Sequence, residues 1–277
     1  MKQRPTARTE QEYVLGTDDD ELVRLGLQHQ LWAEQAAGAW ERAGFGPGQK
    51  LLDAGCGPGY ATFDLASRVG RGGQITAIDA SQRFIRHLQS QAALRGLNNL
   101  VASVGNVERP KLPASTFDGA YARWVLCFVK HPAAVVAGVA RALKRGGVFV
   151  VQDYFDYEGV LIAPDCDVFK RVFKMVARSW RMRGGNPDIG SEVPRLMSRC
   201  GFAVREIRPI VRVARPGSPL WKWPETFFAN YLSPLVKWGL ISKSDGKNFQ
   251  REWRRRSRDP SAFFVTPPVI EVIGVKR

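Results

Sequence analysis

A glycine-rich turn between an apolar strand and a helix places the strongest limit on how this chain can fold. Residues 51–54 form an apolar run containing Asp53, and Gly55, Gly57 and Gly59 follow at alternating positions. Residues 60–69 then carry apolar side chains at helical spacing. Glycines in such a turn let the backbone bend tightly and approach a ligand closely. Strand, turn and helix in this order predict that a nucleotide-like ligand binds where the strand ends.

A second apolar strand over 74–78 closes on Asp79, whose carboxylate stands where it can accept hydrogen bonds from both hydroxyls of a ribose. The same arrangement serves NAD, FAD and S-adenosylmethionine, so the residues around the turn must discriminate among them. A carboxylate at Asp53 would repel a pyrophosphate by roughly 1 kcal/mol or more at short range. Beside the cationic methionyl end of S-adenosylmethionine it would attract, and S-adenosylmethionine is therefore the favoured ligand.

The segments 53–59, 79–81 and 143–147 resemble, in order and spacing, the signature segments of class I S-adenosylmethionine-dependent methyltransferases. Within that family they are similar to the branch of the ubiquinone and menaquinone C-methyltransferases. The resemblance implies a doubly wound, Rossmann-like α/β fold. Its seven-stranded sheet would be mostly parallel with an antiparallel last strand, and a helical cap and insertions would be added. It also implies a methyltransferase that converts S-adenosyl-L-methionine to S-adenosyl-L-homocysteine.

Periodicity predicts further elements in this frame. We expect a helix over 81–95 capped by Ser81, a helix over 132–143, and a helix over 192–199 capped by Ser191. Strands are expected over 100–104, 117–122, 147–152 and 203–213, and a last strand over 262–265 and 269–275 is interrupted by two prolines. The part after the prolines should insert antiparallel beside the fifth and sixth strands.

These elements divide the chain into four expected parts. They are an N-terminal helical cap over 1–44, a cofactor-binding core over 45–153, a lid over 154–195, and C-terminal core strands with a helix over 196–277. The last part holds an aromatic-rich insertion over 214–260. Its aromatic side chains either line a bulky apolar pocket or bury a helical cap on the sheet.

The resemblance also implies which residues hold the cofactor. They come from the cap, the glycine turn and the ends of the following strands: Tyr13, Asp53, Gly55, Cys56, Gly57, Asp79, Ala80, Asn106, Val107 and Arg123. Related enzymes usually carry an acidic residue where Asn106 stands, and use it on the adenine amino group. An asparagine can still accept through its amide oxygen, without charge assistance. In the cap, Tyr13 either contacts a ligand or packs on the core, and Arg24 and Gln28 would face the ligand.

Because a sulfonium methyl group is already electrophilic, catalysis requires alignment of the acceptor and, where needed, removal of a proton. Asp153 and Tyr154 follow the fifth strand, and open α/β sheets bind ligands at the carboxyl ends of their strands. Asp153 is a candidate base, or else it orients the lid. Tyr154 is a candidate that fits a pocket wall better, since an unperturbed phenol is mostly protonated at neutral pH. His29 in the cap is the third candidate, with a satisfied structural histidine as its alternative.

The net charge of +15 raises the alternative of an RNA methyltransferase. Basic residues cluster over 170–183 and 251–258 in apparent helices, where a solvated helix face, an anionic substrate group and RNA phosphates are the alternatives. The Asn/Asp-Pro-Pro-aromatic tetrapeptide of base methyltransferases is replaced after the fourth strand by residues 123–126, which counts against that chemistry. A protein that binds S-adenosylmethionine without transferring methyl is a further alternative.

Composition bears on membrane spans, on the cysteines and on the expected partner. No run approaches the roughly 20 apolar residues of a membrane span, and the first residues are polar, so a cytoplasmic protein is expected. The four cysteines show neither disulfide nor zinc spacing, and no metal is predicted. The expected partner is a small molecule, bulky and apolar or aromatic, with oxygen, nitrogen or carbon as the acceptor atom. Nucleic acid remains an alternative partner, and the aromatic insertion could also form a homodimer face.

Overall fold

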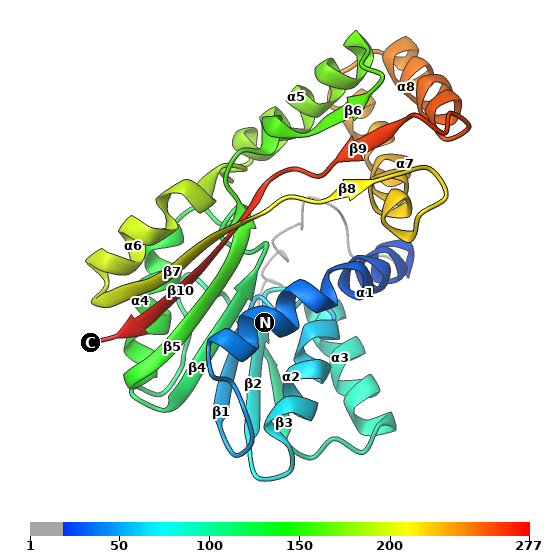
Figure 1. Ribbon diagram of the computed structural model, residues 1–277. Coiled ribbons are helices and arrows are strands. Elements are labelled where there is room, and N and C mark those ends of the chain that lie inside the picture. The colour runs from blue at the N-terminus through cyan, green and yellow to red at the C-terminus, as the bar shows by residue number, and fades with distance from the viewer. Residues whose placement is uncertain (1–18) are drawn as a thin grey trace, which may run out of the picture.

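A seven-stranded sheet forms the centre of the protein, as the computed structural model shows for residues 19–277 (Figure 1). Tyr13, expected at the cofactor, lies outside the described residues. The strands are β1 (Lys50–Ala54), β2 (Gln74–Asp79), β3 (Leu100–Val104), β4 (Phe117–Arg123), β5 (Leu143–Tyr154), β7 (Phe202–Ile210) and β10 (Val269–Lys276). Their order is β3-β2-β1-β4-β5-β10-β7, and β10 runs antiparallel to both of its neighbours. The predicted mostly parallel sheet with an antiparallel last strand is confirmed.

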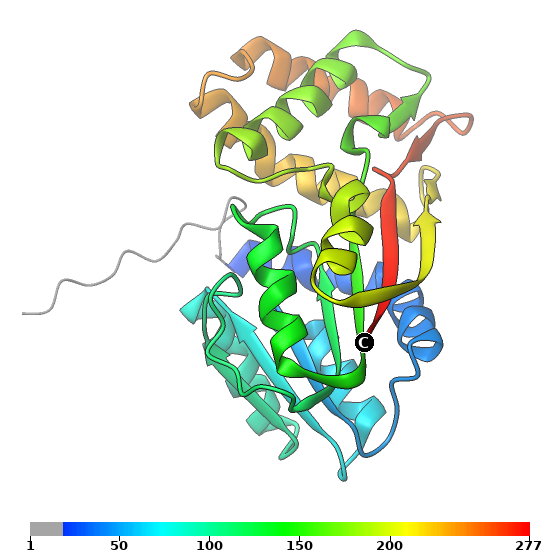
Figure 2. The ribbon, with the colours of Figure 1, turned by 90° about the vertical axis from the view of Figure 1, so that its left-hand side faces the viewer.

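Helices cover both faces of this sheet. On one face lie α1 (Asp19–Arg42), α2 (Tyr60–Val69) and α3 (Gln82–Leu94), and on the other α4 (Pro132–Ala142) and α6 (Val193–Arg199) (Figures 1 and 2). The local sequence explains α3, because Ser81 accepts the backbone N–H of Phe84 at 3.2 Å and the apolar side chains of Phe84, Ile85 and Leu88 are buried. The Ser81 cap was predicted from sequence, and the structure confirms it.

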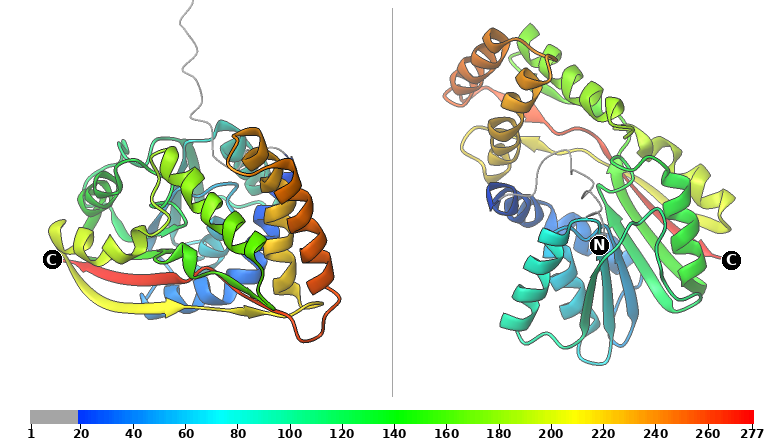
Figure 3. Two further views of the ribbon diagram at one scale, coloured as in Figure 1. Left: turned by 90° about the horizontal axis from the view of Figure 1, so that it is seen from above. Right: turned by 180° about the vertical axis from the view of Figure 1, so that it is seen from behind.

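A second body of structure stands above the carboxyl ends of the parallel strands (Figure 1). It contains α5 (Asp167–Met182), α7 (Lys222–Lys237) and α8 (Lys243–Arg256), which lie side by side when viewed from above (Figure 3). A three-stranded sheet joins them, in the order β6 (Leu161–Ala163), β9 (Phe263–Val265) and β8 (Val213–Ala214). Short 3-10 turns occupy Tyr157–Gly159, Ile189–Glu192 and Pro219–Trp221. The small sheet was not predicted.

Two details of the sequence prediction are wrong. The expected strand over 203–213 ends at Ile210, and Val213–Ala214 pairs with β9 in the small sheet, because the chain crosses there from one sheet to the other. Ser191 does not cap the next helix. Its hydroxyl donates to the Asp188 carbonyl at 2.8 Å inside a 3-10 turn, and the helix begins at Val193, where Pro194 is tolerated in the first turn.

A buried polar network ties the C-terminal end of α1 to the sheet. Arg42 forms an ion pair with Glu271, which is 1% exposed, and donates to Glu206 at 2.8 Å. Gln152 links the same carboxylate, 2.8 Å away, to the Tyr121 hydroxyl, 2.7 Å away. The network links the C-terminal end of α1 to four strands, β4, β5, β7 and β10. None of the helices in residues 19–277 has the length and apolar character needed to cross a membrane.

Candidate functional site

A cavity of about 490 Å³ opens where β1, β2 and β4 end, beneath α1. Every residue predicted to hold the cofactor within residues 19–277 lines it: Asp53, Gly55, Cys56, Gly57, Asp79, Ala80, Asn106, Val107 and Arg123. His29, Gln28 and Leu25 of α1 line it from above. Ligand sites for molecules of this size commonly enclose 300–1,000 Å³, so the volume suits a nucleoside with an attached amino acid.

The glycine turn shapes the floor of this cavity. Gly55 has a φ of +76°, and a Cβ there would lie 2.5 Å from the side chain of Val125, so only glycine fits. Gly57 has a φ of +54°, but a Cβ there would meet nothing within 4 Å, since it borders open space. Asp79 accepts the backbone N–H of Gly57 and of Ser81, each at 2.8 Å. Burial raises the pKa of this carboxyl, and the N–H donors oppose that rise. Asp79 therefore holds the turn against the end of β2.

Asp53 and Arg123 bring opposite charges to the same cavity. Burial raises the pKa of Asp53 to about 6, although the Thr62 hydroxyl donates to it at 2.7 Å. The Nη1 atom of Arg123 is buried and has no hydrogen-bond partner among residues 19–277. A buried donor without a partner is costly, and a ligand carboxylate would satisfy it. An amino acid moiety, with one anionic and one cationic group, fits this pair.

His29 does not have a free ring nitrogen for catalysis. Arg123 Nη2 lies 2.9 Å from Nδ1, and because a guanidinium can only donate, Nδ1 must accept. The ring proton is therefore assigned to Nε2, which lies 2.8 Å from an oxygen of Asp64. Both nitrogens are thus engaged, and the geometry gives His29 the task of orienting Arg123 instead of the predicted task of a base.

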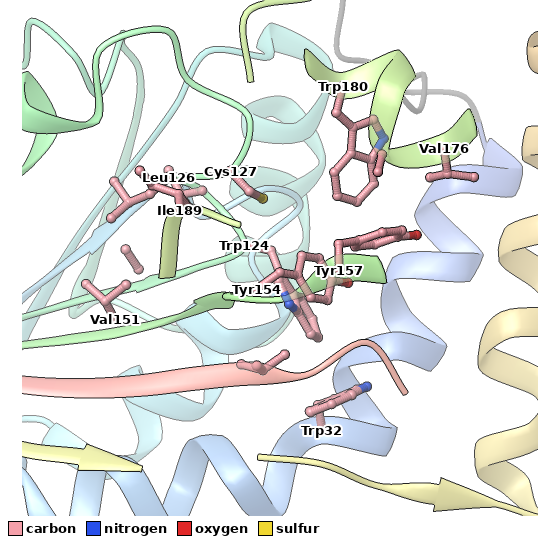
Figure 4. Close-up of a cluster of buried hydrophobic side chains, with 14 of the residues drawn as sticks. Trp32, Trp124, Leu126, Cys127, Val151, Tyr154, Tyr157, Val176, Trp180 and Ile189 are labelled. Atoms are coloured by element: carbon pink, nitrogen blue, oxygen red, sulfur yellow. The ribbon is translucent and has the colours of Figure 1, made fainter. Parts of the chain in front are cut away.

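A smaller cavity of about 40 Å³ adjoins the first, and aromatic side chains form most of its wall. The aromatic residues come from the end of the sheet, the lid and the insertion: Trp124, Phe128, Tyr154, Tyr157, Trp180, Trp223, Phe227, Phe228 and Phe264. Figure 4 shows four of them, Trp124, Tyr154, Tyr157 and Trp180, gathered between the sheet and α5. Gln28, Trp124 and Phe128 line both cavities, so the two meet at these side chains.

Trp124 forms the central part of this shared wall. It lies between Tyr154, with ring centroids 5.9 Å apart, and Trp223, with centroids 6.2 Å apart, in stacked geometry. Its φ of +52° is unusual for a bulky residue and is of a kind that occurs at functional sites. Burial raises the pKa of Tyr154 well above its ordinary value, so this phenol stays protonated and is a wall and a donor, not a base.

Asp153 explains how Trp124 is held in that conformation. The carboxylate is fully buried and lines neither cavity. It accepts the backbone N–H groups of Leu126 at 2.8 Å and of Val125 and Cys127 at 3.2 Å, and that of Tyr154 at 3.0 Å. Burial raises its pKa to about 6. The geometry does not support the predicted base, because the Asp153 carboxylate lines neither cavity. Asp153 instead holds the turn that follows β4 through its hydrogen bonds to residues 125–127.

The aromatic side chains of the insertion divide between a cavity wall and the packing of the helices. Trp223, Phe227 and Phe228 line the smaller cavity, whereas Trp221 stacks on Trp253 of α8 at 4.8 Å inside the helical layer. The volume of about 40 Å³ is only a few times the ~10–15 Å³ that a water molecule requires, so the cavity is smaller than the bulky pocket considered from sequence.

Asn106 departs from the expected arrangement, because its Oδ1 accepts the backbone N–H of Glu108 at 2.8 Å. Only the second lone pair of this oxygen is left for an adenine amino group. The residues that sequence reasoning missed are Trp124 and Trp180. Trp124 carried a signal, since it directly follows the fourth strand, where ligands bind in such sheets.

Both basic clusters lie on helices, as expected, and acidic side chains accompany them. On α5, Arg171 pairs with Asp245 at 3.3 Å, and on α8, Glu252 pairs with Arg256 at 2.7 Å. Arg255 is 80% exposed on α8. These contacts describe solvated helix faces, on which exposed ion pairs contribute little to stability.

Comparison with known proteins places these features in a family. The methyltransferase domain family model matches residues 52–151. Nocamycin O-methyltransferase of Saccharothrix syringae is 38% identical over 101 residues, 36% of this chain and 36% of that protein. A ubiquinone/menaquinone biosynthesis C-methyltransferase of Hydrogenovibrio crunogenus is 28% identical over 151 residues, 54% of this chain and 58% of that protein. The chain thus spans less than two thirds of the length of these curated relatives.

The solved structure of geranyl diphosphate methyltransferase aligns with 90% of this chain and 79% of its own, with a TM-score of 0.56 and 18% identity. At that identity the likeness shows the fold alone. Together with the glycine turn, the strand order and the matches to residues 52–151, it leads to one conclusion. The chain carries a class I S-adenosylmethionine-dependent methyltransferase domain, with S-adenosylmethionine as its cofactor.

Proposed function

We propose that this protein transfers a methyl group from S-adenosylmethionine to an oxygen or carbon atom of a small molecule with an apolar or aromatic acceptor group. The observation that carries the proposal is the meeting of two different cavities at Gln28, Trp124 and Phe128. One cavity has the size and polar groups of a cofactor site, and the other has aromatic walls. A donor and an acceptor bound in adjoining cavities are held in the alignment that methyl transfer needs.

The residues of the larger cavity fit the cofactor group by group. Arg123 Nη1 supports a carboxylate, Asp53 supports the cationic methionyl end, and Asp79 supports the ribose hydroxyls with the acceptor capacity that its backbone donors leave. When bound, the cofactor supplies an electrophilic methyl group. The protein binds and orients both partners and excludes water from the aromatic cavity.

The character of the acceptor follows from the smaller cavity and from the relatives. Its aromatic walls favour a flat or apolar group through area burial and ring contacts. One of the relatives named above methylates at oxygen and the other at carbon, by their names. We therefore propose oxygen or carbon, and not nitrogen, as the acceptor atom.

The proposal is tested in two stages, cofactor binding and methyl transfer. Isothermal titration should show S-adenosylmethionine binding to the wild-type protein, with a loss of about tenfold or more in Asp79→Ala, since hydrogen bonds between a carboxylate and ligand hydroxyls are lost. Asp165→Ala is the matched control, because Asp165 is 53% exposed and lines neither cavity. Unchanged affinity in Asp79→Ala would contradict the assignment of this residue.

Formation of S-adenosylhomocysteine is then followed with a panel of phenols, hydroquinones, isoprenoid alcohols and amines. Turnover with phenols or hydroquinones supports the proposal, whereas turnover with amines alone contradicts the proposed acceptor atom. Cofactor binding without turnover on any compound would favour a protein that binds S-adenosylmethionine for another purpose.

RNA methylation is the second candidate, and the net charge of +15 favours it. Binding through several phosphates would weaken RNA retention steeply with salt, following a linear log–log dependence. Retention on RNA with such a slope, together with methyl incorporation into the RNA, would replace the small-molecule proposal. Salt-insensitive or absent retention would remove this candidate.

A further inference from the structure

Two residues with N–H donors line the place where the cavities meet. Gln28 of α1 and Trp124 after β4 both line the larger and the smaller cavity. Both side chains carry N–H donors, and the structure shows how they are oriented and which hydrogen bonds they make. The inference that follows rests on the proposed function, because it concerns the molecule held in the smaller cavity.

The amide orientation of Gln28 follows from its neighbours. Its Oε1 accepts from the indole Nε1 of Trp223 at 2.8 Å and from Nη1 of Arg24 at 3.0 Å. Both groups can only donate, so the opposite amide orientation would set donor against donor. Arg24 is itself held by Glu21 at 2.6 Å. Within residues 19–277 no acceptor takes a hydrogen bond from Nε2, and the amide N–H₂ is therefore left to a ligand.

Trp124 supplies the second donor. Its side chain is 9% exposed, and its Nε1 is buried without a hydrogen-bond partner among the described residues. Buried indole N–H groups usually find a partner, and an unpaired one costs free energy. Stacking on Tyr154 and Trp223, together with the turn pinned by Asp153, prevents this indole from turning toward solvent. A ligand oxygen at the shared wall would satisfy it.

We infer that Gln28 Nε2 and Trp124 Nε1 together bind an oxygen of the acceptor substrate, and that this oxygen is bound as an anion. The substrate class is then a phenol or an enol, in which one oxygen carries the charge. N–H donors stabilise an oxyanion more than a neutral hydroxyl, because hydrogen bonds to a charged acceptor are stronger. The hydroxyl proton leaves to solvent on binding. Methylation at the oxygen, or at a ring carbon activated by it, is compatible with this site.

The test uses 4-nitrophenol as the probe, because its phenolate absorbs visible light and its phenol form does not. The probe is titrated into the protein saturated with S-adenosylhomocysteine, and nitrobenzene serves as the same ring without the hydroxyl. Binding to the wild-type protein should increase the phenolate fraction at constant pH. Nitrobenzene, followed by calorimetry, reports on the aromatic walls alone.

Gln28→Glu replaces the N–H₂ by a carboxylate oxygen while the other oxygen keeps its bonds to Trp223 and Arg24. It should weaken 4-nitrophenol binding by about tenfold or more and remove the phenolate increase, because an anion now faces an anion. Nitrobenzene affinity should stay within about twofold of wild type, as expected for a ring that does not use this N–H. Gln30→Glu, on the exposed face of the same helix, is the matched control and should behave as wild type.

A second variant, Trp124→Phe, keeps an aromatic ring, removes the indole N–H together with its five-membered ring, and should also reduce the phenolate fraction. The inference is overturned if the wild-type protein does not shift the probe toward phenolate or does not bind it. It is also overturned if Gln28→Glu weakens nitrobenzene as much as 4-nitrophenol, or weakens S-adenosylhomocysteine equally, since the donors would then serve packing or the cofactor. Failure of S-adenosylhomocysteine to bind the wild-type protein would instead refute the proposed function.

Discussion

Asp53→Asn tests the cost of keeping a carboxylate at the floor of the larger cavity. Burial raises the pKa of Asp53 from 3.8 to about 6 in the cofactor-free fold. A shift of this size corresponds to about 3 kcal/mol of unfavourable free energy for the ionised form. Asparagine keeps an oxygen that can accept from the Thr62 hydroxyl and carries no charge. At neutral pH the variant should therefore be more stable than wild type by up to about 3 kcal/mol.

The dependence on pH gives the sign of this effect. Between about pH 4 and pH 6 the folded wild-type protein holds a proton at Asp53 that the unfolded chain has lost, so its free energy of unfolding falls as pH rises through this window. Asp153 has a similarly raised pKa, but it is present in both proteins and cancels from the difference. The stability difference between variant and wild type should grow from pH 4 to pH 6 and be constant above pH 6.

Urea unfolding of the cofactor-free proteins over this pH range measures the difference directly. Cofactor affinity should change in the opposite sense, because the variant loses the attraction between Asp53 and the cationic methionyl end; calorimetry with S-adenosylmethionine at neutral pH measures this loss. A stability difference that does not vary between pH 4 and pH 7 would refute the reasoning. So would a variant that is more stable yet binds the cofactor as tightly as wild type.

The remaining predictions concern the glycine turn, the Arg42–Glu271 ion pair and the turn held by Asp153. Gly57→Ala should lower the free energy of unfolding by about 1–2 kcal/mol through strain at its φ of +54°. Gly59→Ala should lower it further, because its Cβ would also lie 2.2 Å from Leu88. Urea unfolding measures both, and equal stability of the two variants would contradict this. Arg42→Met should lower the free energy of unfolding by about 3 kcal/mol by stranding a buried carboxylate, and adding Glu271→Leu should restore part of it in urea titrations. Asp153→Ala should cost about 1–3 kcal/mol in the same assay because the buried backbone N–H groups of residues 125–127 lose their acceptor, and an unchanged midpoint would argue against this role of Asp153.

Sequence reasoning could predict that Asp53, Gly55 and Asp79 gather at one cavity because their determinants are local. These residues stand within a strand–turn–helix–strand unit, and the carboxyl ends of parallel strands meet at one edge. The same reasoning could not place the small sheet, whose three strands are two or three residues long and come from distant parts of the chain. Such strands carry no periodic signal, and tertiary packing alone defines them.

The hydrogen-bond partners of two predicted catalytic residues could not be predicted from sequence for a related reason. His29 and Asp153 are residue types that suit acid–base work, but their roles depend on partners far away in sequence. Arg123 occupies Nδ1 of His29, and three successive amides after β4 occupy the carboxylate of Asp153. A residue type near a strand end predicts proximity to a site, whereas only the hydrogen-bond geometry shows whether the group remains available for chemistry.

Helix α1 supports both halves of the site through adjacent residues. Gln28 is fixed by Trp223 of the insertion and lines both cavities, while the next residue, His29, orients Arg123 at the cofactor side. Successive helix positions point about 100° apart, so one helix can serve two neighbouring cavities only if its rotation is fixed. The Arg42 network supplies that restraint at the far end. A change that rotates α1 should therefore disturb cofactor and acceptor binding together, although Arg42 lines neither cavity.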